Sequence, residues 1–189
     1  MAVEVVAAAR RLFTREEFLR MAEAGIFKPT DRLELIRGEI VEMSGPGRRH
    51  RAFVDNLNEL LVVRLVGRAM VSVQNPLALD DYSEPQPDLK VIRRRAVPYK
   101  EREAFGEDTL LVIEVSDTSL RYDRSTKLAL YAEFEIPEYW VVDCNDESIE
   151  IHRSPDGGRY REVTRVSGDA TVTLQAFPDV TLTLAEIFA

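Results

Sequence analysis

The chain has 189 residues and a formal net charge of −8 at pH 7, and 45% of its residues are hydrophobic. These values indicate a single globular domain and exclude a disordered chain. The single cysteine, Cys144, excludes a disulfide framework and a Cys-rich zinc site. Because no apolar run approaches ~20 residues and no basic leader precedes one, we expect no membrane span, no signal peptide and a cytoplasmic protein.

The first half of the chain predicts two helices, a hairpin and two strands. Thr14 and Glu17 have the spacing of a capping box, which predicts a short helix over residues 15–24. Apolar residues on either side of Arg37-Gly38 predict a β-hairpin. Leucines and Phe53 then recur at helical spacing. The predicted ranges are strands 33–36 and 39–43, a loop at 44–47, a helix over 48–66, and strands 69–74 and 87–92.

The second half begins with the most apolar segment, residues 109–115, which only Glu114 interrupts. Such a run is typical of a strand that is covered on both faces, at the centre of a sheet. A helix over 122–135, which Pro137 ends, would cross over to the next strand. The remaining predicted strands are 139–142, 148–153, 159–166, 171–174 and 180–184.

This order predicts an α/β fold with a core of helix, three strands, helix and strand. We expect one domain over residues 1–189, with its core at about 48–143. The helix and hairpin of residues 14–43 would precede this core. A β-extension over residues 148–189 would follow it, so that extra strands stand at both ends.

Two acidic residues stand in predicted strands, where an unpaired carboxylate is costly to bury. Asp88 follows Pro87 at the start of one strand, and Glu114 lies inside the most apolar one. Buried carboxylates are normally paired, hydrogen-bonded or bound to metal. If these strands are neighbours, both acids can bind one Mg²⁺, which prefers oxygen ligands and suits phosphodiester hydrolysis.

Gln86-Pro87-Asp88 followed by the segment ending in Glu114-Val115-Ser116 resembles the PD-(D/E)xK nuclease signature. More closely, about residues 30–155 resemble a large bacterial family of restriction-endonuclease-like proteins. The segments that carry this resemblance are Glu34–Met43, Pro87-Asp88, Glu114–Ser116, Asp123–Tyr131 and Pro137–Asp143. The resemblance implies a restriction-endonuclease-like core and a metal-dependent nuclease.

The resemblance also implies roles for individual residues. Asp88, Glu114 and the Val115 carbonyl would hold Mg²⁺ or Mn²⁺. The superfamily lysine is expected two residues after Glu114, where this chain has Ser116. Lys127, on the following helix, is the expected substitute, as in the closer family. It would position the attacking water and stabilise the transition state.

Other candidates each have a structural alternative. Glu39 is either a further metal or water ligand or an exposed strand acid, and His50 is either a proton carrier or phosphate contact or a solvated capping residue. Asp123 is most simply a helix N-cap. Gln86 would face a metal-bound water or have a structural role. The run Arg93–Arg95, with Lys90 and Lys100, would contact phosphates or form a solvated face, whereas Tyr139, Trp140, Cys144 and His152 are expected to be structural.

The charge is distributed unevenly. Residues 128–189 carry 4 basic and 12 acidic side chains, whereas residues 48–127 carry 14 and 13, so the middle of the chain is the part suited to a polyanion. Together with the resemblance, this leads us to expect an Mg²⁺- or Mn²⁺-dependent endonuclease acting on DNA. The resemblance also implies a homodimer, because members of the superfamily often work as dimers. The alternative is a catalytically silent module that uses the same fold to bind nucleic acid or a protein.

Overall fold

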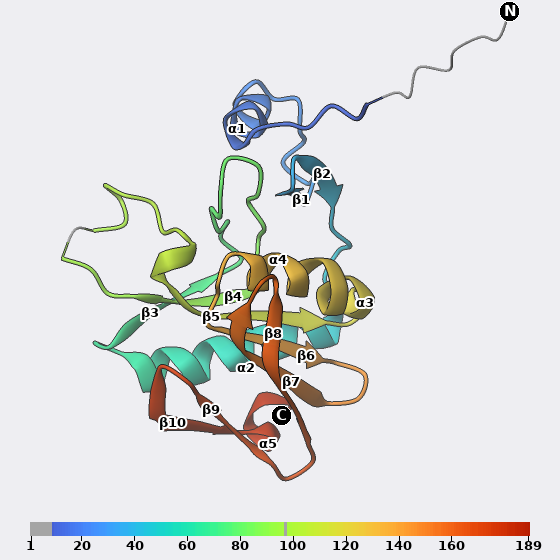
Figure 1. Ribbon diagram of the computed structural model, residues 1–189. Coiled ribbons are helices and arrows are strands. Elements are labelled where there is room, and N and C mark those ends of the chain that lie inside the picture. Colours follow the sequence, from blue (N-terminus) through green and yellow to red (C-terminus); the bar gives the residue numbers. More distant parts are fainter. Residues whose placement is uncertain (1–8, 97) are drawn as a thin grey trace, which may run out of the picture.

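The computed structural model of the protein describes residues 9–96 and 98–189. At its centre lies a six-stranded mixed sheet with the strand order β3-β4-β5-β6-β7-β8 (Figure 1). β5 and β6 run parallel, and the other neighbouring strands are antiparallel. The strands are β3 (Ala69–Val73), β4 (Leu89–Arg93), β5 (Thr109–Ser116), β6 (Glu138–Asp143), β7 (Ser148–Asp156) and β8 (Arg159–Ser167).

β5 is the central strand that its apolar sequence predicts. All eight of its residues are buried, and it lies between β4 and β6. Successive side chains of a strand point to opposite faces. Leu111, Ile113 and Val115 therefore share one face, and Val112 and Glu114 lie on the other. This alternation places a carboxylate inside one of the two layers that cover the sheet.

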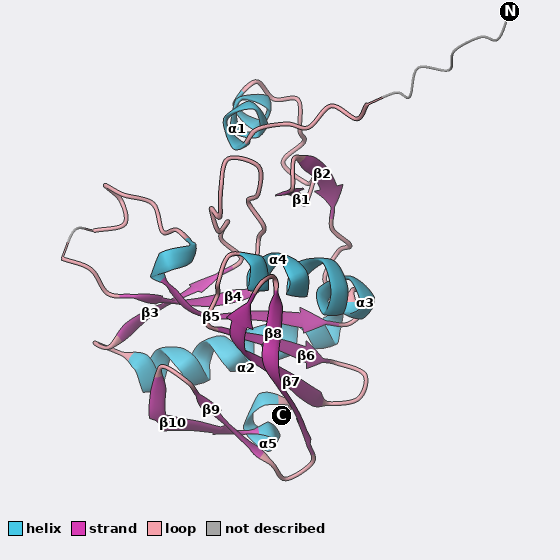
Figure 2. Cartoon of the chain, viewed as in Figure 1, coloured by secondary structure: helices cyan, strands magenta, loops and turns pink. Residues whose placement is uncertain are grey.

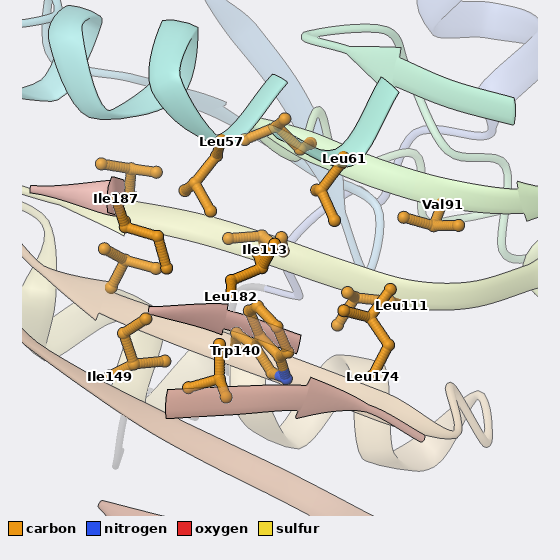
Figure 3. Packing of buried hydrophobic residues seen from close by; sticks show 14 of the residues in the cluster. Leu57, Leu61, Val91, Leu111, Ile113, Trp140, Ile149, Leu174, Leu182 and Ile187 are labelled. Atoms are coloured by element: carbon orange, nitrogen blue, oxygen red, sulfur yellow. The ribbon is translucent and has the colours of Figure 1, made fainter. Parts of the chain in front are cut away.

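Helices cover both faces of the sheet (Figure 2). On one face lie α2 (Arg48–Leu65), the hairpin of β9 (Thr171–Leu174) and β10 (Phe177–Thr183), and α5 (Leu184–Ile187). Leu57 and Leu61 of α2 lie over Ile113, with Trp140 of β6 in the same cluster (Figure 3). On the other face, the crossover from β5 to β6 consists of α3 (Leu120–Tyr122), the π-helical turn η2 (Asp123–Lys127) and α4 (Leu128–Glu133).

The N-terminal elements form a separate small unit at the edge of this sandwich (Figure 1). α1 (Arg15–Glu23) begins with the predicted capping box, and β1 (Leu33–Ile36) pairs with β2 (Glu39–Glu42). The turn between these strands needs left-handed backbone, with φ 79° at Gly38. A Cβ at Gly38 would also lie 2.6 Å from the Leu12 Cβ, so glycine is required there. A short 3₁₀ helix, η1 (Gly106–Asp108), precedes β5.

Most predicted elements are present, and three of the four differences have local causes. The predicted helix over 122–135 begins earlier, at Leu120, and contains the π-turn η2. β4 begins after Pro87, which has no N–H to donate to a neighbouring strand. β10 spans Phe177–Thr183 because its pairing with β9 shifts register, and a capping box at Thr183 then begins α5.

The fourth difference concerns the predicted C-terminal extension. β7 and β8 continue the central sheet, and β9, β10 and α5 contribute to its main hydrophobic cluster. The core therefore extends well beyond residue 143. Within the two described ranges, no helix combines the length and apolar composition needed to cross a membrane.

Candidate active site

A cleft of about 370 Å³ opens where β5 ends. Its walls come from the β1–β2 hairpin, the first turn of α2, the segment before β4, and the crossover that begins with α3. Ligand sites of α/β sheets commonly lie at the carboxyl ends of strands, because the chain turns there into a crossover connection. The polar lining used below consists of Glu34, His50, Gln86, Asp88, Glu114, Tyr122, Asp123 and Lys127.

Asp88 and Glu114 lie next to each other at the base of the cleft. Val115 N donates to Asp88 Oδ2 over 2.9 Å, and Asp88 N lies within 3.4 Å of Glu114 Oε2. The antiparallel pairing of β4 with β5 produces this proximity, because Leu89 is opposite Ile113. Asp88 is 8% exposed and Glu114 is 5% exposed. Two nearly buried carboxylates thus share one edge of the cleft.

Lys127 joins two carboxylates from different parts of the chain. Its Nζ donates to Glu34 Oε1 over 2.5 Å and to Glu114 Oε1 over 2.9 Å. Tyr131, one turn further along the crossover, donates its hydroxyl to the same Glu114 oxygen over 2.7 Å. Asp123 and Lys127 stand at the two ends of the π-turn, and both are buried. Lys127 therefore reaches the acids from the helix layer.

The titration of these groups reflects burial and crowded negative charge. Burial and the nearby Asp123, Asp88 and Glu34 carboxylates raise the pKa of Glu114 to about 8, although Lys127 opposes the shift. Burial lowers the pKa of Lys127, but the Glu114 and Glu34 carboxylates raise it more, and the net pKa is above its usual value. Burial also raises the pKa of Asp123, whose carboxylate accepts hydrogen bonds from Ser116 and Ser119. The cleft thus holds a protonated lysine among more acids than it can neutralise.

His50 and Gln86 complete the surroundings of the acids. His50 Nε2 lies 3.0 Å from Asp88 Oδ1, whereas its buried Nδ1 has no partner among the described residues. The side-chain amide of Gln86 donates to the main-chain carbonyl of Gln74, and the main-chain N–H of Gln86 donates to Glu34 Oε1 over 2.9 Å. Gln86 therefore ties the hairpin acid to the segment before β4. Asp123 is not a helix N-cap, because Ser119 has that position and Asp123 lies inside the π-turn.

Several predicted residues lie away from the cleft. Glu39 is half-exposed on β2, and its carboxylate forms an ion pair with Arg10 over 2.6 Å. Lys90 is buried, and its ammonium donates to main-chain carbonyls of Asn75 and Pro76. Arg93 follows Asp88 by five residues along β4, which places the arginine run roughly 17 Å away at the far end of the strand. The four residues that were expected to be structural are all buried: Tyr139, Trp140, Cys144 and His152.

Glu34 is the site residue that the sequence reasoning missed. It is 0% exposed on β1 and contributes one oxygen to Lys127, while its Oε2 has no partner among the described residues. A signal was present, because Glu34 interrupts Leu33-Glu-Leu-Ile36 as Glu114 interrupts its own strand. The hairpin thus contributes Glu34 to the cleft and leaves Glu39 in solvent.

Residues 15–185 match the Uma2 family, whose description is "Putative restriction endonuclease". An uncharacterized protein of Synechocystis sp. (sll1609) is 25% identical over 170 residues, which cover 87% of this chain and 93% of that protein. The crystal structure of a putative nuclease of the DUF820 family from Anabaena variabilis is similar with a TM-score of 0.75. It has 17% sequence identity, and the match covers 93% of this chain and 97% of that one.

Proposed function

Because this chain belongs to the Uma2 family, described as "Putative restriction endonuclease", we propose that it is a metal-dependent endonuclease that hydrolyses phosphodiester bonds in DNA. The observation that carries the proposal is the convergence of Asp88, Glu114 and Lys127 in one cleft. These residues come from the segment before β4, from β5 and from η2, and each is buried. A buried charged cluster that opens into a cleft is typical of a catalytic site.

The donor atoms fit a hard divalent cation. The main-chain N of Asp88 lies 3.4 Å from Glu114 Oε2, so the two carboxyl groups are neighbours. Burial, together with the nearby acids, raises the pKa of Glu114, and a bound cation would stabilise its charged form. Among residues 9–96 and 98–189, no three His, Cys, Asp or Glu side chains are grouped closely enough to form a full ligand set. The Val115 carbonyl and water would therefore complete the site, as suits Mg²⁺, which keeps several waters. Mn²⁺ takes similar ligands.

A bound metal would lower the pKa of a coordinated water and stabilise charge on the phosphate. Lys127 would add a fixed positive charge beside the scissile phosphate. Because the adjacent carboxylates hold the pKa of Lys127 above its usual value, its ammonium donates hydrogen bonds and does not act as a base at neutral pH. Its role would be to orient the attacking water and stabilise the transition state.

His50 and Asp88 form a second pair. With Nε2 held 3.0 Å from Asp88, the imidazole keeps that carboxylate in place. Its Nδ1, which has no partner in the described part of the chain, would then take up or release a proton during the reaction. In hydrolysis, water attacks phosphorus and gives up a proton, the bond to the leaving oxygen breaks, and that oxygen takes up a proton.

The experiment is a cleavage screen on plasmid, linear duplex, single-stranded DNA and RNA, with Mg²⁺ or Mn²⁺. We expect metal-dependent cleavage of DNA that Asp88→Asn or Glu114→Gln reduces by about 10³-fold, the scale of a lost electrostatic catalytic group. Glu162→Gln, which changes an exposed acid on β8, is the matched control and should keep full activity. An Asp88→Asn protein that cleaves like the wild type would refute the assignment. Metal-independent DNA binding without cleavage would favour the silent module.

A further inference from the structure

Besides His50 Nδ1, two buried polar atoms of the cleft lack a partner in the described part of the chain. They are Glu34 Oε2, on the hairpin wall, and the hydroxyl oxygen of Tyr122, at the end of α3. Both atoms are buried. Buried polar groups are nearly always hydrogen-bonded, so unpartnered ones that line a cleft indicate groups that a ligand satisfies.

The chemistry of Glu34 restricts which part of a DNA substrate can meet it. A carboxylate needs a hydrogen-bond donor and repels phosphate. The deoxyribose-phosphate backbone offers only acceptors, whereas the bases carry amino and imino N–H groups. In a duplex, base pairing occupies the imino N–H groups, and the amino groups that face the grooves do not reach a carboxylate that is 0% exposed. Glu34 therefore fits the edge of an unpaired base, and the Tyr122 hydroxyl can either donate to it or accept from it.

The size of the cleft and the depth of the acids agree with this restriction. A cavity of about 370 Å³ is of the size that takes a small organic ligand, as one nucleotide is. Asp88, Glu114 and Lys127 are at most 8% exposed, so a phosphodiester must enter the cleft to reach them. A continuous duplex surface would stay at the rim.

The charges of the cleft wall are also unlike those of a duplex-binding groove. Duplex binders neutralise rows of phosphates with lysine and arginine. Here the wall carries more acidic residues than basic ones. Its basic residues are Arg32 and Lys127, and Arg93 lies outside the cleft, at the far end of β4. The acidic residues of the wall are Glu34, Glu42, Asp88, Glu114, Asp117 and Asp123.

We propose that the cleft takes one unpaired nucleotide, with its base against Glu34 and Tyr122 and its phosphodiester at Asp88 and Glu114. The substrate class would then be single-stranded or locally unpaired DNA, not intact duplex. Enzymes that act on nucleotides in closed pockets meet the same requirement by extruding a nucleotide from the stack. This inference rests on the proposed function, because it concerns the same cleft.

A binding experiment without turnover tests the substrate class separately from catalysis. Fluorescence anisotropy in Ca²⁺ would compare the wild-type protein on a single-stranded oligonucleotide, its full duplex, and the same duplex with a central unpaired loop. We expect the single strand and the looped duplex to bind at least tenfold more tightly than the full duplex. Equal or tighter binding of the full duplex, or no binding of any of the three, overturns the inference. Absence of cleavage in Mn²⁺ would refute the proposed function, while the order of affinities would still decide this inference.

A pair of tyrosine variants tests the contact itself. Because the Tyr122 hydroxyl has no partner in the described chain, Tyr122→Phe should keep the wild-type Tm and Mn²⁺ affinity but weaken single-strand binding by about threefold to tenfold. Tyr160→Phe is the matched control. Its hydroxyl donates to the Ile136 carbonyl away from the cleft, so that variant should lower Tm and leave DNA binding unchanged. Unchanged single-strand binding in Tyr122→Phe would overturn the contact.

Discussion

Replacement of Lys127 by methionine would remove the cation from between two buried carboxylates. The Lys127 side chain is 3% exposed, and its Nζ lies 2.5 Å from Glu34 Oε1 and 2.9 Å from Glu114 Oε1. Breaking a buried ion pair by removing one partner typically costs about 3–5 kcal/mol, because the other charge is left uncompensated. We expect Lys127→Met to lose about this much stability at pH 8 in the absence of divalent cations.

The loss should depend on pH in a defined direction. Burial and neighbouring carboxylates already raise the pKa of Glu114 to about 8 in the wild-type protein, and removal of Lys127 would raise it further. When the pKa of an acid is higher in the folded state than in the unfolded state, the acid contributes its full stability below the unfolded-state pKa, here near 4.5. That contribution to the free energy of unfolding is lost as pH rises through the folded-state pKa. The cost of Lys127→Met should therefore be smaller at pH 5 than at pH 8.

Lys90 provides the matched control, because it is also buried but is bound by carbonyl oxygens. Burial lowers the pKa of Lys90 to about 8, so its charged form costs the fold about 3 kcal/mol below that pH. As pH rises from about 8 to 10.5, this cost disappears, and the native lysine becomes relatively more favourable. Lys90→Met should therefore be less destabilising at pH 7 than at pH 10.

Urea unfolding of both variants at several pH values measures these differences directly. In both variants, the loss of stability should increase with pH. For Lys127→Met it should increase from pH 5 to 8, and for Lys90→Met from pH 8 to 10. A Lys127→Met protein as stable as the wild type at pH 8, in metal-free buffer, would refute the ion-pair account of the cleft.

Two further predictions concern the proposed metal and the hairpin acid. Because the pKa of Glu114 is raised to about 8, a metal must displace its proton, so Mn²⁺ affinity should rise about tenfold from pH 6 to 7 and level off above 8. Isothermal titration in buffers of different ionisation enthalpy measures both the affinity and the released proton, and a constant affinity from pH 6 to 9 would contradict the prediction. Glu34→Gln should lower the cleavage rate at least tenfold, because Lys127 loses one of its two anchoring carboxylates, whereas Glu39→Gln should stay within about twofold of wild type. A single-turnover assay in which Glu39→Gln lowers the cleavage rate more than Glu34→Gln would restore the sequence-based choice of Glu39.

Local patterns in the sequence predicted much of the fold. The apolar run around Glu114 identified the central strand, and Thr14 with Glu17 identified the start of α1. The capping box at Thr183 is an equally local signal, but it follows a strand directly and was missed. Pairing across the sheet is not local, so the sequence did not reveal that β7 and β8 continue the central sheet.

The candidate site was only partly predictable for the same reason. Asp88 and Glu114 could be paired because each stands in or beside a strand of apolar sequence. The choice between Glu34 and Glu39 depends on which face of a short hairpin meets the sheet, and that is a tertiary contact. Lys90 and Lys127 look alike in sequence, yet one is held by carbonyls and the other by carboxylates.

The crossover position of Lys127 has a consequence for how the protein would lose activity. A lysine on β5 itself would stay beside Glu114 as long as the strand remained paired. Here the ammonium and the acid belong to different layers, so their 2.9 Å contact persists only while the crossover stays docked on the sheet. Short helical segments at the surface commonly open at lower free energy than central strands. Mild denaturant would therefore separate Lys127 from Glu114 by undocking the crossover before the sheet unfolds, and inactivation would precede global unfolding.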